Sequence, residues 1–210
     1  MGNTVAAVVL TGGRSRRMGR DKALLTLPDG RKCLQVVLEA AHAVASPVFL
    51  AVDTEDHATR LCAALQHPLP RVVLDTIPGA GPLAAISAAL RAAAPADIVA
   101  LAVDAPFVRP RLLEILCQSI QDSAARLPDA VAVRVNGVSQ PLPALYTARL
   151  ADLADQLLRD GRAGPRALLE APEVFVRWLD MAVVQAADPD LRSFAEANTP
   201  EQWQALWGLY

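Results

Sequence analysis

Short apolar runs alternate with amphipathic stretches over the first 120 residues, and this alternation limits the folds that the chain can adopt. Four runs stand out: VAAVVL (5–10), VFLAV (48–52), RVVL (71–74) and DIVALAV (97–103). Short, continuous apolar runs are typical of strands that are covered on both faces. Apolar residues at helical spacing follow them, over residues 33–45, 55–65, 83–90 and 112–120. This order predicts an α/β fold, with three α/β/α layers around a mostly parallel, Rossmann-like sheet.

The pattern changes after about residue 130. Two apolar runs flank Asn136-Gly137 and predict a β-hairpin. Helical patterns cover residues 147–160 and the shorter segment 164–171, and VFVRWL (174–179) is expected to be a strand. A last helix is expected after Thr199, a candidate N-cap that is followed by proline. The chain has no internal repeat, low-complexity linker or sharp boundary, so we expect a single domain over residues 1–210.

The overall composition excludes several classes of partner. The chain has 20 basic and 22 acidic side chains and a formal net charge of -2, whereas bulk nucleic-acid binding needs a broad basic surface. Its three cysteines form no CxxC pair, which favours reduced thiols over disulfides or a zinc site. No apolar run reaches about 18 residues, and the N-terminus lacks a signal-peptide pattern. We therefore expect a cytoplasmic protein with neither nucleic acid nor membrane as a partner.

Positive charge is concentrated in the segment LTGGRSRRMGRDKALL (10–25), which holds four arginines and one lysine. The segment follows a predicted strand, at the edge where open parallel sheets bind ligands. Gly12 and Gly13 allow the backbone to approach a ligand closely, and the cations can neutralise a polyphosphate. The segment fits neither the P-loop pattern GxxxxGK[ST] nor the dinucleotide pattern GxGxxG. A solvated basic turn is the alternative, but glycines directly after a buried strand favour an anion site.

The same segment resembles the N-terminal signature of the molybdenum cofactor guanylyltransferases, which belong to a larger group of nucleotidyltransferases. Three further segments agree with that family in order and spacing: DTIPGAGPLAAI (75–86), VDAPFV (103–108) and FAEANTPE (194–201). The resemblance therefore covers almost the whole chain. The double glycine before Ser-Arg-Arg-Met-Gly, together with Gly-Pro-Leu, is more similar to the guanylyl branch than to the cytidylyl branch.

The resemblance implies an enzyme that transfers GMP from GTP to the phosphate of molybdenum-molybdopterin by in-line attack at the α-phosphate. The products are the guanine dinucleotide cofactor and pyrophosphate. Mg²⁺ is the implied cofactor, GTP and molybdopterin or molybdenum cofactor are the implied substrates, and molybdoenzymes or their chaperones are implied as transient partners. Residues 1–130 are expected to form the nucleotide-binding half and residues 131–210 an elaboration that binds the acceptor.

On the phosphate side, the resemblance assigns roles to the segment after the first strand. Leu10, Thr11 and Gly12 are implied to lie against the guanosine, and the loop from Gly13 to Arg17 is implied to wrap the phosphates. Lys22 matches the lysine that contacts the nucleotide phosphates in the family. Arg17 and Lys22 are therefore predicted to be catalytic, because cations near the α-phosphate stabilise charge that builds up on the leaving pyrophosphate.

On the base side, Asp75 matches the aspartate that the family holds near guanine and ribose. A carboxylate can accept hydrogen bonds from guanine N1–H and N2–H₂ together, which would select guanine over adenine. A turn aspartate before Pro78-Gly79 is the alternative. Gly81 is a further candidate for nucleotide binding, because the helix N-terminus that follows it could face phosphate or guanine. A simple role in starting the helix, with Pro82 at the first helical position, explains Gly81 equally well.

Asp104 is the strongest single candidate. It ends a buried strand, so its carboxylate should emerge on the ligand side of the sheet. Mg²⁺ prefers one or two carboxylates together with substrate phosphates and waters, and one aspartate meets that requirement. By resemblance, Asp104 is catalytic, contacts the nucleotide and holds Mg²⁺ on the α-phosphate. The alternative is a turn aspartate before Pro106. Asp97, at the other end of the same strand, is expected to be structural.

The acceptor side is assigned mainly by resemblance. Gln140 resembles a residue of the segment that family members use near the pterin, and Asn198 matches an asparagine of the terminal Asn-Thr-Pro-Glu motif. Asn198 is explained equally well as a residue that precedes a helix cap. Glu196 departs from the family, which often has a second asparagine there. Three arginines could bind the acceptor phosphate, although solvated loop positions are the ordinary explanation: Arg159, Arg162 and Arg166.

Two other interpretations remain open. The first is a molybdopterin cytidylyltransferase or a sugar-phosphate nucleotidyltransferase, which the basic segment alone does not exclude. The second is a non-catalytic carrier of molybdenum cofactor, which the presence of Lys22 and Asp104 disfavours. No nucleophile triad is visible. The histidines His42, His57 and His67 are dispersed without a carboxylate pattern for a relay, so we expect them at surface or helix positions.

Overall fold

The computed structural model describes residues 5–11, 21–65, 68–75, 77, 79–120, 126–195 and 202. Within this part of the chain, the strands form one seven-stranded sheet in the order β3-β2-β1-β4-β6-β5-β7. The strands are β1 (Val5–Leu10), β2 (Val48–Val52), β3 (Arg71–Leu74), β4 (Asp97–Ala102), β5 (Ala130–Val135), β6 (Val138–Tyr146) and β7 (Val176–Trp178). The pairs β3–β2, β2–β1, β1–β4 and β5–β7 are parallel, whereas β6 is antiparallel to both β4 and β5.

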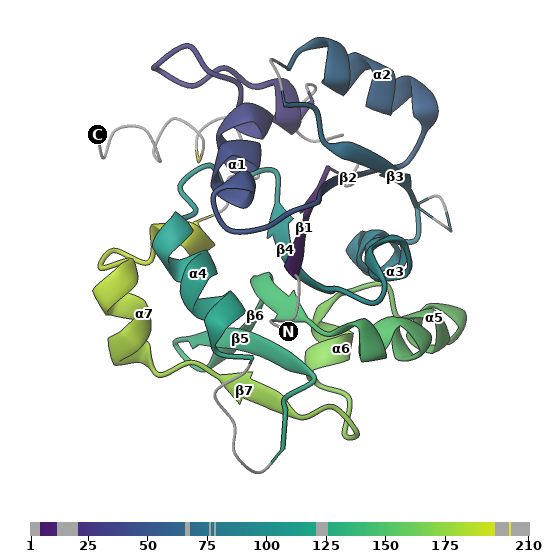
Figure 1. Cartoon of the computed structure of the whole chain (residues 1–210), viewed down its shortest axis with the longest axis vertical. Coiled ribbons are helices and arrows are strands. Elements are labelled where there is room, and N and C mark those ends of the chain that lie inside the picture. Colours follow the sequence, from purple (N-terminus) through teal and green to yellow (C-terminus); the bar gives the residue numbers. More distant parts are fainter. Residues whose placement is uncertain are drawn as a thin grey trace.

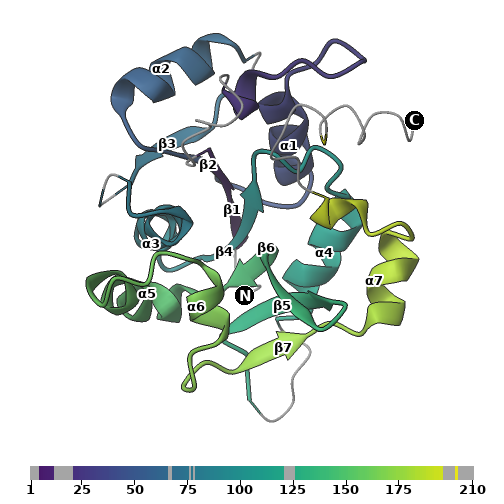
Figure 2. The same cartoon turned by 180° about the vertical axis from the view of Figure 1, so that it is seen from behind.

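Helices cover both faces of this sheet, so the three-layer arrangement expected from the sequence is confirmed. The first face carries α1 (Cys33–His42), α2 (Glu55–Ala63), α4 (Pro110–Gln118) and α7 (Met181–Ala187), and the second carries α3 (Pro82–Ala93), α5 (Ala151–Arg159) and α6 (Arg166–Leu169). In Figure 1, α1 and α4 lie on one side of β1 and β4, and α3 and α5 lie on the other; Figure 2 shows the same layers from behind. No helix among the described residues is long and apolar enough to cross a membrane.

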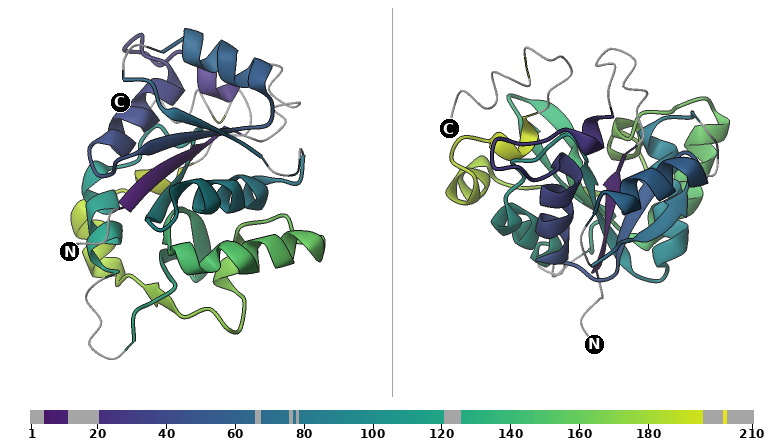
Figure 3. Two further views of the ribbon diagram at one scale, coloured as in Figure 1. Left: turned by 45° about the vertical axis from the view of Figure 1, so that its right-hand side comes forward. Right: turned by 90° about the horizontal axis from the view of Figure 1, so that it is seen from above.

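The continuous apolar runs of the sequence are explained by the two cores on either side of the sheet. In β1, Ala7 and Val9 pack into the core under α1 and α4, while Ala6 and Val8 pack under α3. Successive side chains of a strand point to opposite faces, so a strand between two helical layers has no polar face. The two views in Figure 3, one turned about the vertical axis and one from above, show helices on both faces of the sheet.

Local differences from the expected elements have local causes. The predicted hairpin is confirmed, and its turn residues Asn136 and Gly137 both have positive φ angles of 51° and 77°, as a two-residue turn of this type requires. The helix expected over 147–160 divides into a 3₁₀ turn (Ala148–Leu150) and α5. The strand expected over 174–179 is limited to the three residues of β7. The helix expected after Thr199 lies outside the described residues, apart from Gln202, which is helical.

The carboxyl ends of four parallel strands meet at one edge of the sheet. The chain moves outward from β1 to β2 and β3 and then returns to place β4 on the other side of β1. Ligands of open α/β sheets bind where the strand order reverses in this way. The antiparallel β6 contributes its beginning to the same edge, because Ala144 pairs with Ala100 and the residues before Ala144 extend toward the end of β4.

Candidate active site

A lysine and an aspartate that are far apart in the sequence meet at this edge. Lys22 begins a 3₁₀ turn (Lys22–Leu24) whose N-cap is Asp21, and Asp104 follows β4. Lys22 Nζ donates to Asp104 Oδ2 at 2.6 Å, and the two side chains are only 15% and 17% exposed. The pair brings together two residues for which the sequence predicted separate contacts to phosphate and metal.

Cys33 lies directly beneath this pair. Its Sγ donates to the carbonyl oxygen of Val103 at 2.9 Å. Burial, and secondly the negative charge of Asp104, raise the pKa of the Cys33 thiol to about 12. Because the thiolate is the nucleophilic form, Cys33 is a protonated, structural thiol and provides no nucleophile at this site.

Asp75 presents a buried acceptor at the end of β3. Its backbone N–H donates to the Val52 carbonyl at 2.9 Å, which fixes it beside the end of β2. Its Oδ1 is buried and accepts no hydrogen bond from any residue in the described part of the chain. Burial, and secondly the charge of Asp53, raise the pKa of Asp75 to about 6. A buried polar atom without a partner is costly, so this oxygen is ready to accept an N–H group from a ligand.

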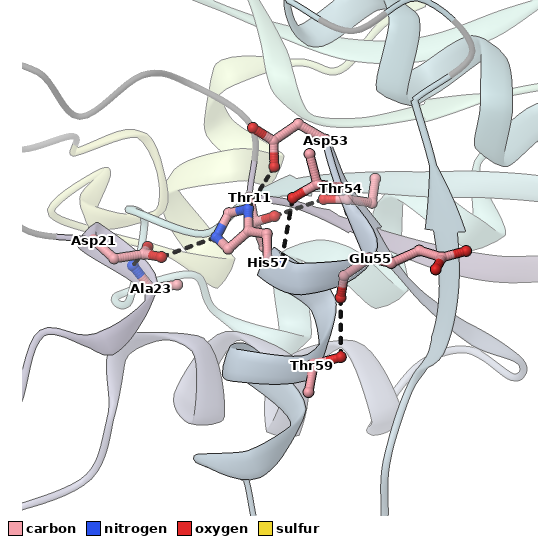
Figure 4. A network of polar contacts seen from close by, with 9 residues as sticks. Thr11, Asp21, Ala23, Asp53, Thr54, Glu55, His57 and Thr59 are labelled. Carbon is pink, nitrogen blue, oxygen red and sulfur yellow. Dashed lines mark hydrogen bonds and ion pairs between the residues drawn. The ribbon is translucent and has the colours of Figure 1, made fainter.

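His57 connects the end of β2 with the turn that carries Lys22, and sequence reasoning missed it. Figure 4 shows its ring between two carboxylates. Nδ1 lies 2.8 Å from Asp53 Oδ1, and Nε2 lies 2.8 Å from Asp21 Oδ2. The expected helix position of His57 is confirmed, whereas its two carboxylate contacts were not predicted. The local signal was the Asp53/His57 spacing of four residues at the start of α2; the contact with Asp21 spans 36 residues and has no local signature.

Leu10 and Thr11, the candidate residues at the end of β1, are held in place by the sheet. The Thr11 hydroxyl and backbone N–H both donate to the Ala51 carbonyl, at 2.6 and 3.1 Å. Leu10 is buried in the core that α3 covers. Thr11 therefore ends β1 at the edge with its hydroxyl already bonded to β2, and Leu10 supports that end from within the core. Gly12, Gly13 and Arg17 lie outside the described residues.

Gly81 has a packing role of its own. It is the N-cap of α3 with a φ angle of 87°, a conformation that favours glycine. A Cβ atom there would lie 3.1 Å from the carbonyl oxygen of Ala163, which also accepts from Leu83 N–H. The close approach joins the start of α3 to the loop that carries Arg162, which is exposed. Gly81 therefore both begins the helix α3 and allows the close approach of the Ala163 loop.

The acceptor candidates are placed only in part. Gln140 is half-buried in β6, opposite Val133, and its amide donates to the Val138 carbonyl at 3.2 Å. Its position before Ala144 puts it toward the same sheet edge as Asp104. Asn198 and Glu196 lie outside the described residues. Asp97 has the structural role expected of it, because its Oδ1 accepts from Ala148 N–H at 3.0 Å.

The donor set at the edge suits a metal ion that takes few protein ligands. Among the described residues, no group of three or more His, Cys, Asp or Glu side chains could hold a metal. Mg²⁺ needs no such cage, since it keeps waters and substrate phosphates around one or two carboxylates. Asp104, next to a lysine at the edge of the sheet, fits that requirement.

Fold and site together define the class of protein: an α/β nucleotidyltransferase with a paired lysine and aspartate at the switch point of its sheet. The model of the MobA-like NTP transferase domain matches residues 7–177. The chain belongs to this MobA-like NTP transferase family, and the resemblance inferred from its motifs is confirmed.

Similar proteins match nearly the whole chain. A protein of Mycobacterium avium, named as a probable molybdenum cofactor guanylyltransferase, is 34% identical over 96% of this chain and 94% of its own length. The crystal structure of molybdopterin-guanine dinucleotide biosynthesis protein A from Archaeoglobus fulgidus is 27% identical, with a TM-score of 0.82 and 97% coverage of both chains. A Mycobacterium tuberculosis protein solved in complex with manganese is 19% identical, with a TM-score of 0.69 over 99% of this chain and 100% of that one, and shares the fold.

Proposed function

We propose that the protein transfers GMP from GTP to the phosphate of molybdenum-molybdopterin and releases pyrophosphate. The observation that carries the proposal is the arrangement along one sheet edge: a buried, unpartnered Asp75 oxygen at β3 and the Lys22–Asp104 pair at β4. The names of the Mycobacterium avium and Archaeoglobus fulgidus proteins support guanine and molybdopterin as the two substrates.

Asp75 is the proposed guanine reader. Guanine presents N1–H and N2–H₂ side by side, and one carboxylate can accept from both. Adenine and cytosine present no such pair of donors. A base that supplies these hydrogen bonds would also relieve the cost of the unpartnered Oδ1, so part of the binding energy depends on the correct base.

The spacing along the edge fits a nucleoside triphosphate. Neighbouring strands lie about 4.8 Å apart, so the three steps from β3 to β4 span roughly 14 Å. With its base at Asp75, an extended nucleotide would place its triphosphate near Lys22 and Asp104. Arg17, Gly12 and Gly13 belong to the segment between β1 and Lys22 and are proposed to wrap the phosphates.

The chemistry needs positioning and charge stabilisation rather than a protein nucleophile. An oxygen of the acceptor phosphate forms a bond to the α-phosphorus, and the bond from that phosphorus to the bridging oxygen of the β-phosphate breaks. The leaving pyrophosphate takes the electron pair, and Lys22 neutralises charge that builds up on it. Asp104 would hold Mg²⁺, which supplies charge neutralisation at the α-phosphate when bound.

Acceptor binding is assigned to the second half of the chain, residues 131–210. Gln140 at the beginning of β6 faces the same end of the sheet as the nucleotide site. Asn198, together with Arg159 at the end of α5, Arg162 in the loop and Arg166 at the start of α6, completes the proposed contacts. This division gives residues 1–130 the nucleotide and leaves the pterin to the hairpin and the helices that follow it.

Calorimetry tests the proposal directly. GTP, CTP and ATP are titrated with and without Mg²⁺ into the wild type, Asp104→Ala and Asp75→Asn, and release of pyrophosphate is then measured with molybdenum-molybdopterin. We expect GTP to bind best, Asp104→Ala to lose the Mg²⁺-dependent part, and Asp75→Asn to lose the preference for GTP. Tighter binding of CTP would favour a cytidylyltransferase, and GTP binding without pyrophosphate release would favour a carrier.

A further inference from the structure

The residue that the proposed mechanism leaves unused is His57. It is largely buried, with its side chain 11% exposed, although it lies in the first turn of α2. Both ring nitrogens are within hydrogen-bond distance of a carboxylate oxygen, at 2.8 Å each. The imidazole ring therefore bridges the two carboxylates.

The two carboxylates belong to different segments at the edge of the sheet. Asp21 is the N-cap of the turn that carries Lys22, and its other oxygen accepts from Ala23 N–H at 3.1 Å. Asp53 follows β2 and is the charged neighbour that acts on Asp75. Figure 4 shows the ring of His57 as the connection between these segments. The turn that carries Lys22 is thus bonded to the strand end beside the proposed guanine reader.

We propose that His57 is a positioning residue of the nucleotide site: by bridging Asp21 and Asp53, it fixes the turn that carries Lys22 relative to the base-binding end of the sheet. The proposal rests on the proposed function. Lys22 must reach both Asp104 and the phosphates, and a cation misplaced by about 1 Å costs catalysis up to roughly 100-fold. Loss of the ring also leaves the Asp21 and Asp53 carboxylates without this shared contact, near a ligand with four negative charges.

The groups around His57 allow a matched control on the same helix turn. Thr54 is the N-cap of α2, and its hydroxyl accepts from the backbone N–H of His57 at 3.2 Å. Thr54→Ala therefore weakens the start of α2 without removing either ring contact, and removal of such a cap typically costs about 1 kcal/mol. Glu55 and Asp56 are the other charged groups of this first turn, and they are unchanged in every variant.

The test uses His57→Ala, His57→Gln and Thr54→Ala in the full chain. Hydrogen exchange of residues 21–25 is measured without nucleotide, and the Kd for GTP and the KM for the acceptor are measured separately. We expect His57→Ala to lose protection at residues 21–25 and to bind GTP about 10- to 100-fold more weakly, with the acceptor KM unchanged. His57→Gln, whose single amide nitrogen cannot take the places of both ring nitrogens, should fall between the wild type and His57→Ala.

Two results would overturn the proposal. One is unchanged exchange at residues 21–25 in His57→Ala, which would mean that the bridge holds nothing in place. The other is an equal loss of GTP affinity in Thr54→Ala, which would mean that any weakening of α2 has the same effect. If the wild type itself bound no GTP, the proposed function would fail instead, and the exchange measurement would still report whether the bridge fixes the turn.

Discussion

Lys22 and Asp104 neutralise each other in the nucleotide-free protein. Each side chain is mostly removed from solvent, so removal of one partner leaves the other as a poorly solvated charge. The sequence identified both residues, because each stands at a recognisable motif. It did not predict the contact between them, because a pair separated by 82 residues has no local pattern and depends on how β1 and β4 lie side by side.

A double-mutant cycle measures this pair. Lys22→Ala and Asp104→Ala should each destabilise the protein by about 1–3 kcal/mol, and the double variant by less than the sum, with a coupling of about 0.5–3 kcal/mol. Urea denaturation of the four proteins gives these values. Strict additivity would mean that the two charges do not depend on each other.

Either single variant should also lower kcat by about 100-fold or more.

Asp75 is a residue at which stability and function oppose each other. Its pKa is raised to about 6 by burial and by Asp53, so the folded state binds its proton more tightly than the unfolded state does. This tighter proton binding contributes its full stabilisation of the folded state below the normal aspartate pKa. The contribution is lost as the pH rises through about 6. At neutral pH the buried carboxylate therefore disfavours folding.

We expect Asp75→Asn to raise the Tm of the nucleotide-free protein at pH 7.5, because the amide carries no charge to desolvate. In a domain of this size, each 1 kcal/mol corresponds to about 2–4 °C. The gain should shrink at pH 4.5, where the wild-type carboxyl is protonated in the folded state. Thermal denaturation at both pH values checks this, and a constant gain would show that ionisation of Asp75 is not the cause.

The same ionisation predicts the pH dependence of GTP binding. In the proposed function the charged form of Asp75 would accept the two donors of guanine, so GTP affinity should fall as the pH drops below about 6. Titrations from pH 5 to 8 in wild type and Asp75→Asn separate this effect from titration of the nucleotide itself. The steeper fall should belong to the wild type, and parallel curves would contradict the assignment.

At the scale of elements, the start of α3 depends on a backbone that only glycine adopts easily. Gly81 has φ 87° and ψ -176° and lies against Ala163, whereas Gly79 has a positive φ of 77° but open space around it. The helices and strands themselves could be predicted, because apolar spacing and turn residues are local signals. The packing of the Ala163 loop on Gly81 could not, because it joins segments about 80 residues apart.

The two glycines provide a matched pair of variants. Gly81→Ala should destabilise the protein by at least the cost of the strained backbone, about 1–3 kcal/mol, and more than Gly79→Ala, because the added methyl group also meets the Ala163 carbonyl. Chemical denaturation of both variants gives the difference. Equal losses would mean that backbone strain alone governs the start of α3.

At the scale of the whole molecule, the class and layering of the fold followed from the sequence, because the strands between two helical layers must be apolar throughout. The edge at which the site lies also followed, because it is a property of any open parallel sheet. The bridge through His57 did not follow, because the fold alone brings the ends of β2 and the Lys22 turn together. Prediction from the sequence thus extended to the layers of the fold and to the sheet edge of the candidate site, and not to the contacts that support the candidate residues.

Ligand binding should stabilise the molecule as a unit. A nucleotide at 100 times its Kd adds about 2.7 kcal/mol to the free energy of unfolding, which raises the Tm by roughly 5–10 °C for a chain of this length. GTP with Mg²⁺ should give this shift in the wild type, and Asp104→Ala should lack the Mg²⁺-dependent part. Thermal melts at several GTP concentrations measure it, and a shift independent of concentration would exclude binding to the folded state.

The reversed direction of β6 has a consequence for how such a molecule can diversify. Four parallel strands deliver their last residues to the site, while β6 delivers its first residues to the same place. The hairpin and the described residues after it are joined to the rest at the β4–β6 pairing, and they also pack on α3 through α5 and the Ala163 loop. Under the proposed function, changes in this second part would alter the acceptor while the triphosphate site stays the same, so one activation chemistry would serve many products.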